Sequence, residues 1–247
     1  MKENKEWFES WFDSPYHALL YQHRDDVEAK KFIDKLFSFL QPAAAAKILD
    51  IACGDGRHAA YMSQFVQEVI GIDLSHNRIQ RAMEHRKEGL HFYRHDMRRV
   101  FRSNYFDFAF NFFTSFGYFS QFRDNIIAAE SFAKSLKPGG TLMIDYMNVH
   151  FVQQHLVAKE TVRVDQIVFD IERSIVEGRI LKQIRFTDRG GLAQQYEESV
   201  AILDINDFDR IFAQTGLERI AVFGDYNLHH FEPNSSPRLI LLYKKPA

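Results

Sequence analysis

The stretch that decides the fold is KILDIACGDGRHA, residues 47–59. It begins with a run of mostly apolar residues, 48–51, of the kind expected for a parallel strand buried on both faces. Gly54 and Gly56 can adopt positive φ and let the backbone come close to a ligand, and a helix is predicted over residues 57–65. A strand, a glycine turn and a helix N-terminus leave free N–H groups, which favour a negatively charged ligand group.

The acidic residues around this turn narrow the choice of ligand. The turn satisfies the Gly/Ala form of the dinucleotide fingerprint, so a nicotinamide dehydrogenase is one alternative. Asp50 and Asp55, however, would repel a pyrophosphate at short range. An α-amino acid moiety needs N–H donors for its carboxylate and oxygen acceptors for its ammonium group, and Asp50 with the backbone of residues 52–56 can offer both. The turn therefore suits a zwitterion.

The next two predicted strands supply further groups for the same ligand. Residues 69–72 form a second apolar strand, and Asp73 lies 19 positions after Gly54, where a carboxylate accepts hydrogen bonds from ribose hydroxyls. A third strand, residues 90–93, leads to His95-Asp96-Met97, which places a polar group beside an apolar one. These can hold the amino edge and the face of an adenine. The implied ligand has an amino acid end, a ribose and a base.

With these motifs the chain resembles the class I S-adenosylmethionine-dependent methyltransferases. DIACGDGRHA is similar to their glycine motif, GIDLS to their ribose acid, HDM to their adenine loop, and LKPGGTLMIDYMN to the turn and strand that close the cofactor half. The nearest resemblance is to small-molecule methyltransferases with an antiparallel insert after the fifth strand, and NFFTSFGYF is a further signature. The resemblance implies S-adenosyl-L-methionine as cofactor, bound by Tyr21, Arg24, Asp50, Ala52, Gly54, Gly56, Asp73, Leu74, Asp96, Met97, Asn111 and Phe112.

Composition excludes several other classes of protein. A net charge of −2 over 247 residues gives no general attraction to nucleic acid or to an anionic membrane. No apolar run approaches the length of a membrane span, and the N-terminus lacks an apolar signal core. The single cysteine, Cys53, fits a reducing compartment and is predicted to be a small buried residue of the turn. We therefore expect a cytoplasmic protein that is a monomer or a homodimer.

The segments before the glycine turn predict a helical cap. Residues 4–12 place aromatic side chains on a ridge, and residues 16–24 form either a packing strap or a segment that closes over the cofactor. Asp25 is the predicted N-cap of a scaffold helix that ends near Leu40. After the third strand, we expect a strand at 106–110, a helix at 124–136 and a fifth strand at 141–146, preceded by a type II turn at 137–140.

Residues 161–203 change to an alternating pattern, which predicts a three-stranded antiparallel meander that acts as a lid or a subunit contact. A helix capped by Asn206 and closing strands at 217–223 and 238–243 follow. The predicted fold is a doubly wound seven-stranded Rossmann-like α/β sheet with an N-terminal cap and this insert. Its predicted parts are the cap (1–41), the S-adenosylmethionine-binding core (42–150), the insert (151–204), and the C-terminal helix and hairpin (205–247).

The predicted reaction is methyl transfer to an N, O or C atom of a small molecule. A tRNA or other nucleic-acid base methyltransferase is an alternative. The similar DNA methyltransferases that act on amino groups carry Asn/Asp-Pro-Pro-Tyr where this chain has Asn111-Phe112-Phe113-Thr114, which counts against methylation of a base's exocyclic amine. A non-catalytic S-adenosylmethionine-binding protein is a further alternative. No catalytic metal is expected, because the acid pair of the metal-dependent catechol enzymes is missing. Candidates for a general base, on position alone, are Tyr146, His150, Tyr226, His229 and His58.

Overall fold

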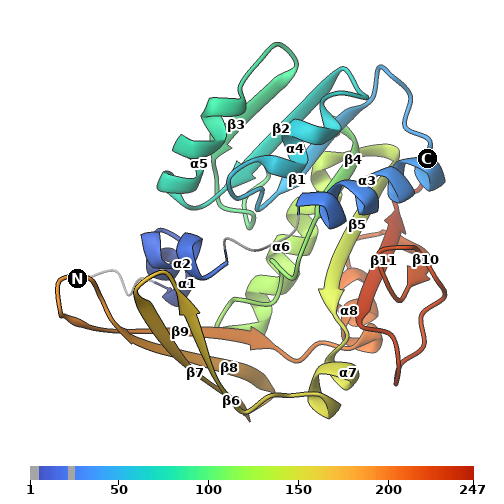
Figure 1. The fold of residues 1–247 in the computed structure, drawn as a ribbon. Coiled ribbons are helices and arrows are strands. Elements are labelled where there is room, and N and C mark those ends of the chain that lie inside the picture. Colours follow the sequence, from blue (N-terminus) through green and yellow to red (C-terminus); the bar gives the residue numbers. More distant parts are fainter. Residues whose placement is uncertain (1–5, 22–25) are drawn as a thin grey trace.

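The computed structural model describes residues 6–21 and 26–247, so the predicted cofactor residue Arg24 and the predicted N-cap Asp25 lie outside the described residues. The central feature is a seven-stranded sheet (Figure 1). Its strands, in spatial order, are β10 (Glu218–Phe223), β11 (Arg238–Lys244), β5 (Leu136–Met147), β4 (Phe106–Asn111), β1 (Lys47–Ile51), β2 (Glu68–Asp73) and β3 (Leu90–Arg94).

Strand β1 lies at the centre of the parallel part of this sheet. Leu49 pairs with Ile70 of β2 on one side and with Ala109 of β4 on the other. The chain thus continues to opposite sides of β1, and ligands of open α/β sheets bind where the strand order reverses in this way, beyond the carboxyl ends of the strands. β11 joins antiparallel to β5, and β10 antiparallel to β11, as the sequence predicts.

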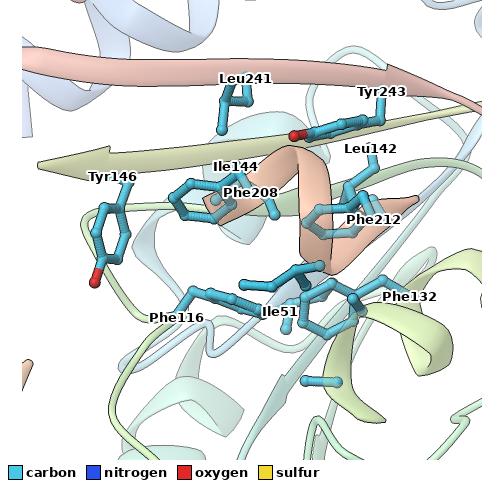
Figure 2. Close-up of a cluster of buried hydrophobic side chains, with 14 of the residues drawn as sticks. Ile51, Phe116, Phe132, Leu142, Ile144, Tyr146, Phe208, Phe212, Leu241 and Tyr243 are labelled. Atoms are coloured by element: carbon cyan, nitrogen blue, oxygen red, sulfur yellow. The ribbon is translucent and has the colours of Figure 1, made fainter. Parts of the chain in front are cut away.

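Helices cover both faces of the sheet because successive strand residues point to opposite sides. Ile48 packs with Phe32 and Ile33 of α3 (Asp26–Leu40), and α4 (Arg57–Met62) and α5 (His76–Ala82) lie in the same layer. Leu49 faces the other layer, formed by α6 (Phe122–Ser135) and α8 (Ile205–Phe212). Figure 2 shows rings of α8 and α6 packed beneath β5 and β11, with Phe116, Phe132, Phe208, Phe212 and Tyr243 in the cluster.

Several local predictions need correction. The helix after the glycine turn ends at Met62 rather than Phe65, and the C-terminal helix is capped by Asp204, not Asn206; Asp204 accepts hydrogen bonds from the N–H groups of residues 206 and 207. Strand β5 begins at Leu136 rather than at 141, so the predicted turn at 137–140 lies within it and interrupts its register with β4; Gly139 has a φ of 76°, as the third residue of a type II turn requires. A short helix α7 (Val149–Gln154), capped by Asn148, was not predicted.

The insert is a separate sheet of four strands rather than three: β6 (Lys159–Val164), β7 (Ile167–Val176), β8 (Arg179–Thr187) and β9 (Ala193–Ala201). A tight turn at Asp165, which has a φ of 51°, makes residues 159–164 a strand of their own. The cap helices α1 (Trp7–Trp11) and α2 (Pro15–Leu20) pack against the inner face of this sheet, where Trp11 and Leu20 meet Phe169. Figure 1 shows the two helices between the insert and α5.

Candidate active site

A cavity of about 430 Å³ lies at the carboxyl edge of the parallel strands. Its walls come from the β1–α4 turn, the end of β2, and the loops after β3 and β4. The cap and strand β9 of the insert close the other side. Nine of the predicted cofactor residues line the cavity: Tyr21, Asp50, Ala52, Gly54, Asp73, Leu74, Asp96, Met97 and Phe112.

The glycine turn is held by backbone hydrogen bonds and left-handed φ angles. Gly54 has a φ of 56° and donates its N–H to Asp73 Oδ2 at 2.9 Å. Asp73 Oδ1 accepts a second hydrogen bond from Ser75 N at 2.8 Å. Gly56 has a φ of 80°, and a Cβ there would lie 2.6 Å from the Phe92 ring, so this glycine is required for close packing under the turn. Gly56 supports the cavity from behind and does not line it.

Asp50 is a buried acid with unused bonding capacity. It is 1% exposed, and its Oδ2 has no hydrogen-bond partner within the described chain. Burial, with the nearby charge of Asp73, raises the pKa of Asp50 to about 8. A cation placed beside this carboxyl would favour its ionised form and satisfy the open oxygen. The residue therefore fits the ammonium group of an amino acid moiety.

Asp96, on the loop after β3, differs from Asp50 because its pKa is lowered rather than raised. Burial alone would raise its pKa, but hydrogen bonds from Arg98, the shortest at 2.7 Å, lower the pKa below the ordinary value. Arg98 also reaches Asp124 at 3.2 Å and thus joins two acids in an ion-pair network. Asp96 is consequently ionised and fixed beside Met97 in the cavity wall.

Aromatic side chains dominate the part of the cavity near the cap. Trp7, Phe12 and Tyr118 pack at centroid distances of 5.2 to 5.7 Å from one another. On the sheet side, His58 stacks on Phe112 with centroids 4.9 Å apart, and Phe113 lies 5.1 Å from the same imidazole. Of the five suggested bases, His58 alone lines the cavity among the described residues.

Glu198 of β9 is the residue through which the insert reaches the cavity. Its Oε1 accepts hydrogen bonds from Trp11 Nε1 at 2.7 Å and from the Tyr21 hydroxyl at 2.6 Å. Lys182 of β8 donates to that same hydroxyl at 2.5 Å, and its Nζ lies 3.9 Å from Glu198 Oε2, too far for a direct hydrogen bond. Tyr21, predicted as a cofactor residue, is thus tied to the insert.

The structure places the other predicted site residues away from the cavity. Tyr146 is buried and donates its hydroxyl to Ala201 O at 2.6 Å, and Figure 2 shows its ring at the edge of the core cluster. Tyr226 donates to Asp145. The remaining three are Asn111, fully buried behind the wall, His150, exposed on α7, and His229, exposed and bonded to Asp225.

Sequence reasoning missed His17, Arg78 and Glu198 as cavity residues. Arg78 Nη2 lies 2.8 Å from His17 Nδ1 and joins α5 to the cap, and Arg78 Nε donates to Phe12 O at 3.3 Å. These side chains are brought together by the docking of the cap between α5 and the insert. No pattern within one segment could have identified them.

The family model described as "Methyltransferase domain" matches residues 21–222. The chain belongs to this methyltransferase family. The dTDP-3-amino-3,4,6-trideoxy-alpha-D-glucopyranose N,N-dimethyltransferase of Streptomyces venezuelae is 23% identical over 70% of this chain and 76% of its own length. A solved S-adenosylmethionine-dependent methyltransferase from Clostridium acetobutylicum has a TM-score of 0.79 at 17% identity, covering 94% of this chain and 96% of that one.

A third comparison is with the amino pentose methyltransferase CalS10 of Micromonospora echinaspora, solved with S-adenosylmethionine bound. Its TM-score is 0.69 at 18% identity, covering 94% of this chain and 97% of that one. The methyltransferase is an S-adenosylmethionine-dependent enzyme with the Rossmann-like fold predicted from the sequence. The open oxygen of Asp50 and the glycine turn fit the amino acid end of that cofactor. The described helices include none long and apolar enough to cross a membrane.

Proposed function

We propose that this methyltransferase transfers the methyl group to the nitrogen of a small-molecule amine. The observation that carries the proposal is the charge of the cavity. Its described lining holds five carboxylates but two guanidinium groups. Asp96 is paired with Arg98, and burial favours the protonated form of Asp50. The acid that faces the cap is therefore Glu198, which the insert contributes. Such a lining attracts a cationic acceptor and repels carboxylates and phosphates. The aromatic rings of Trp7, Phe12 and Tyr118 add favourable faces for a cation.

When bound, S-adenosylmethionine would supply an activated methyl group. An acceptor that enters as an ammonium ion first releases one proton to solvent, and its nitrogen lone pair then forms the new N–C bond while the electron pair of the C–S bond goes to sulfur. The chain's own residues bind, orient and exclude water. In this proposal Asp50, Asp73 and Asp96 bind the cofactor, and Glu198 Oε2 accepts an N–H of the acceptor. Its Oε1 is already occupied by Trp11 and Tyr21, which fixes the orientation of the carboxylate.

The names of similar proteins support a nitrogen acceptor. The Streptomyces venezuelae relative is an N,N-dimethyltransferase of an amino sugar, and the Micromonospora structure is of an amino pentose methyltransferase. Both act on sugars that carry an amino group. The insert, predicted as a lid or a subunit contact, serves here as the acceptor side of the site.

The first test is calorimetric titration with S-adenosylmethionine and S-adenosylhomocysteine, with NAD as control, followed by an acceptor screen. Three amines (glucosamine, ethanolamine and phenylethylamine) are each compared with the alcohol of the same skeleton, and released S-adenosylhomocysteine is measured. We expect turnover with amines and none with alcohols. Turnover confined to hydroxyl or carboxylate acceptors would contradict the proposal, and tight cofactor binding without any turnover would favour a non-catalytic protein.

The role of Glu198 is tested separately with Glu198→Gln. This change removes the charge and keeps the shape, and should raise KM for the accepted amine roughly 10- to 100-fold, the range for loss of a hydrogen bond to a charged group. Glu197→Gln is the matched control, since Glu197 is the exposed neighbour on the same strand. Equal KM values in the two variants would show that Glu198 does not bind the acceptor and serves only to hold the cap through Trp11 and Tyr21.

A further inference from the structure

The loop after β4 has an unusual backbone conformation. Phe113 and Thr114 are consecutive residues with φ angles of 55° and 58°. Bulky and β-branched side chains rarely adopt the left-handed region, because Cβ approaches the following carbonyl oxygen. Two such residues in succession persist only where surrounding groups hold them. The contacts that hold this turn therefore indicate what it is for.

Asp145, near the end of β5, binds both residues of the turn. Its Oδ2 accepts the N–H of Phe113 at 2.8 Å, and its backbone carbonyl accepts the N–H of Thr114 at 2.9 Å. The side chain of Asp145 is fully buried. One residue thus satisfies both backbone donors of the left-handed pair.

Arg238 of β11 completes the arrangement from the neighbouring antiparallel strand. Its Nε donates to Asp145 Oδ1 at 2.8 Å, and its Nη2 donates to Thr114 Oγ1 at 3.1 Å. Tyr226, from the loop between β10 and β11, donates its hydroxyl to Asp145 Oδ2 at 3.3 Å, and its ring lies 5.6 Å from that of Phe113. Segments far apart in the sequence therefore converge on one turn.

The turn connects this buried cluster to the cavity. Phe113 lines the cavity and contacts the imidazole of His58, whereas Asp145, Arg238 and Tyr226 are not among the described lining residues. Asp145 and Tyr226 contact the lining residue Phe113, and Arg238 bonds the neighbouring Thr114, so the cluster contacts the site through the turn that it holds.

We propose that Asp145, Arg238 and Tyr226 are positioning residues for methyl transfer. They hold the Phe113–Thr114 turn in its left-handed conformation and thereby place the Phe113 ring in the cavity. This role is independent of whether the acceptor is an amine. In this proposal Asp145, at the end of β5, and Tyr226, in the loop between β10 and β11, act on the reaction by holding the turn and not by touching the substrate.

Two mild variants test the role without breaking the buried ion pair. Thr114→Val removes the hydroxyl that accepts from Arg238 and keeps the β-branched shape, and Tyr226→Phe removes the hydroxyl that donates to Asp145. Thr141→Val and Tyr243→Phe are matched controls, because each loses one hydroxyl on a strand outside the cavity lining. Tyr243 is buried, and its hydroxyl has no hydrogen-bond partner in the described chain.

For each variant, kcat and KM are measured with the best acceptor from the screen, S-adenosylhomocysteine affinity by calorimetry, and amide exchange at residues 113 and 114. We expect kcat to fall about ten-fold in Thr114→Val and about three-fold in Tyr226→Phe, since misplacement by a fraction of an ångström disrupts alignment. Affinity for S-adenosylhomocysteine should stay within about two-fold of the controls, and exchange at the turn should accelerate.

Two outcomes would overturn the proposal. Exchange rates equal to those of the controls would show that the cluster does not hold the turn, whatever the acceptor. A loss of kcat matched by an equal loss of S-adenosylhomocysteine affinity or of melting temperature would show general destabilisation instead of positioning. Failure of the amine proposal has a different signature, since it changes which acceptor turns over and leaves these comparisons between variants and controls intact.

Discussion

The two halves of the cavity are built in different ways. The half that we propose for the cofactor, the cofactor half, comes from residues 50–97, where strands are followed directly by the loops that line the cavity. The half that we propose for the acceptor, the acceptor half, is assembled from the cap, the loop after β4, and Glu198 of the insert. The first depends on local rules of strand, turn and helix. The second depends on how three distant segments dock.

The bonds that hold the two halves differ as well. In the cofactor half, backbone N–H groups of Gly54 and Ser75 bind one carboxylate, that of Asp73. In the acceptor half, side chains bind side chains, as Tyr21 and Trp11 do with Glu198. A backbone-anchored site tolerates changes of side chain around it, whereas a side-chain network changes with each member. We therefore expect substitutions in the two halves to separate cofactor affinity from acceptor KM.

The largest effect is expected for Asp73→Ala. It removes the acceptor for Gly54 N and Ser75 N and the carboxylate proposed to bind the ribose, so S-adenosylhomocysteine affinity should fall at least about 100-fold. Calorimetry measures the affinity, and circular dichroism checks the fold. Asp170→Ala, on the exposed side of the insert, is the control. Unchanged affinity would remove Asp73 from the site.

The glycine turn itself is tested by its free energy of unfolding. In Gly56→Ala the new Cβ would lie 2.6 Å from the Phe92 ring at a φ of 80°, so we expect a loss of about 2 kcal/mol. Gly54→Ala should cost less, since the nearest atom is the flexible Arg78 Nη1. Denaturant unfolding compares the two. A larger cost at Gly54 would mean that the packing under the turn is looser than the structure shows.

The raised pKa of Asp50 leads us to expect that cofactor binding depends on pH. Its folded-state pKa of about 8 is above the unfolded value, so the ligand-free fold holds the proton more tightly and loses stability as pH rises between about 4 and 8. Binding an ammonium group requires the ionised form. Affinity for S-adenosylhomocysteine should therefore rise about five-fold between about pH 7 and about pH 8, as the ionised fraction grows from about a tenth to about half.

Calorimetry across this range measures the effect. Asp50→Asn is the comparison variant, because it cannot titrate. It should bind more weakly and show a flatter profile. The same pH dependence in Asp50→Asn would assign the titration to another group, such as Asp73, whose pKa burial also raises.

In the half that we propose for the cofactor, the sequence predicted seven residues that line the cavity, because their information is local; it missed Arg78. Asp50, Gly54, Asp73 and Asp96 each stand at a fixed position relative to a predicted strand, and the parallel sheet brings those strand ends to one edge. Short runs of apolar residues likewise located all seven strands of the main sheet. In the main sheet and its helices most errors were at boundaries, such as the helix cap at Asp204, where two acidic or amide residues competed. The fourth strand of the insert and helix α7 were missed outright.

The acceptor half could not be predicted, because it depends on contacts between segments that are distant in the sequence. Glu198 is one of several polar residues on an alternating strand, and nothing near it in the sequence shows that it meets Trp11 across the cap. Tyr146 and Tyr226 were suggested as bases because they follow strand ends. The structure places both outside the cavity lining, where their hydroxyls donate to Ala201 O and to Asp145. A position near a strand end does not show whether a side chain lines the cavity or packs in the core behind it.

The smallest expected effect on KM or on affinity is that of Tyr21→Phe. This variant tests whether Tyr21 belongs to the cofactor half or to the acceptor half. The sequence assigns Tyr21 to the cofactor, whereas its hydroxyl bonds Glu198 and Lys182 of the insert. If the insert contact dominates, losing one hydroxyl should raise the acceptor KM about three-fold and leave S-adenosylhomocysteine affinity within about two-fold. Steady-state kinetics and calorimetry on the same preparation separate the two. A ten-fold loss of cofactor affinity with an unchanged acceptor KM would return Tyr21 to the cofactor half, and the boundary between the halves would then run through the cap.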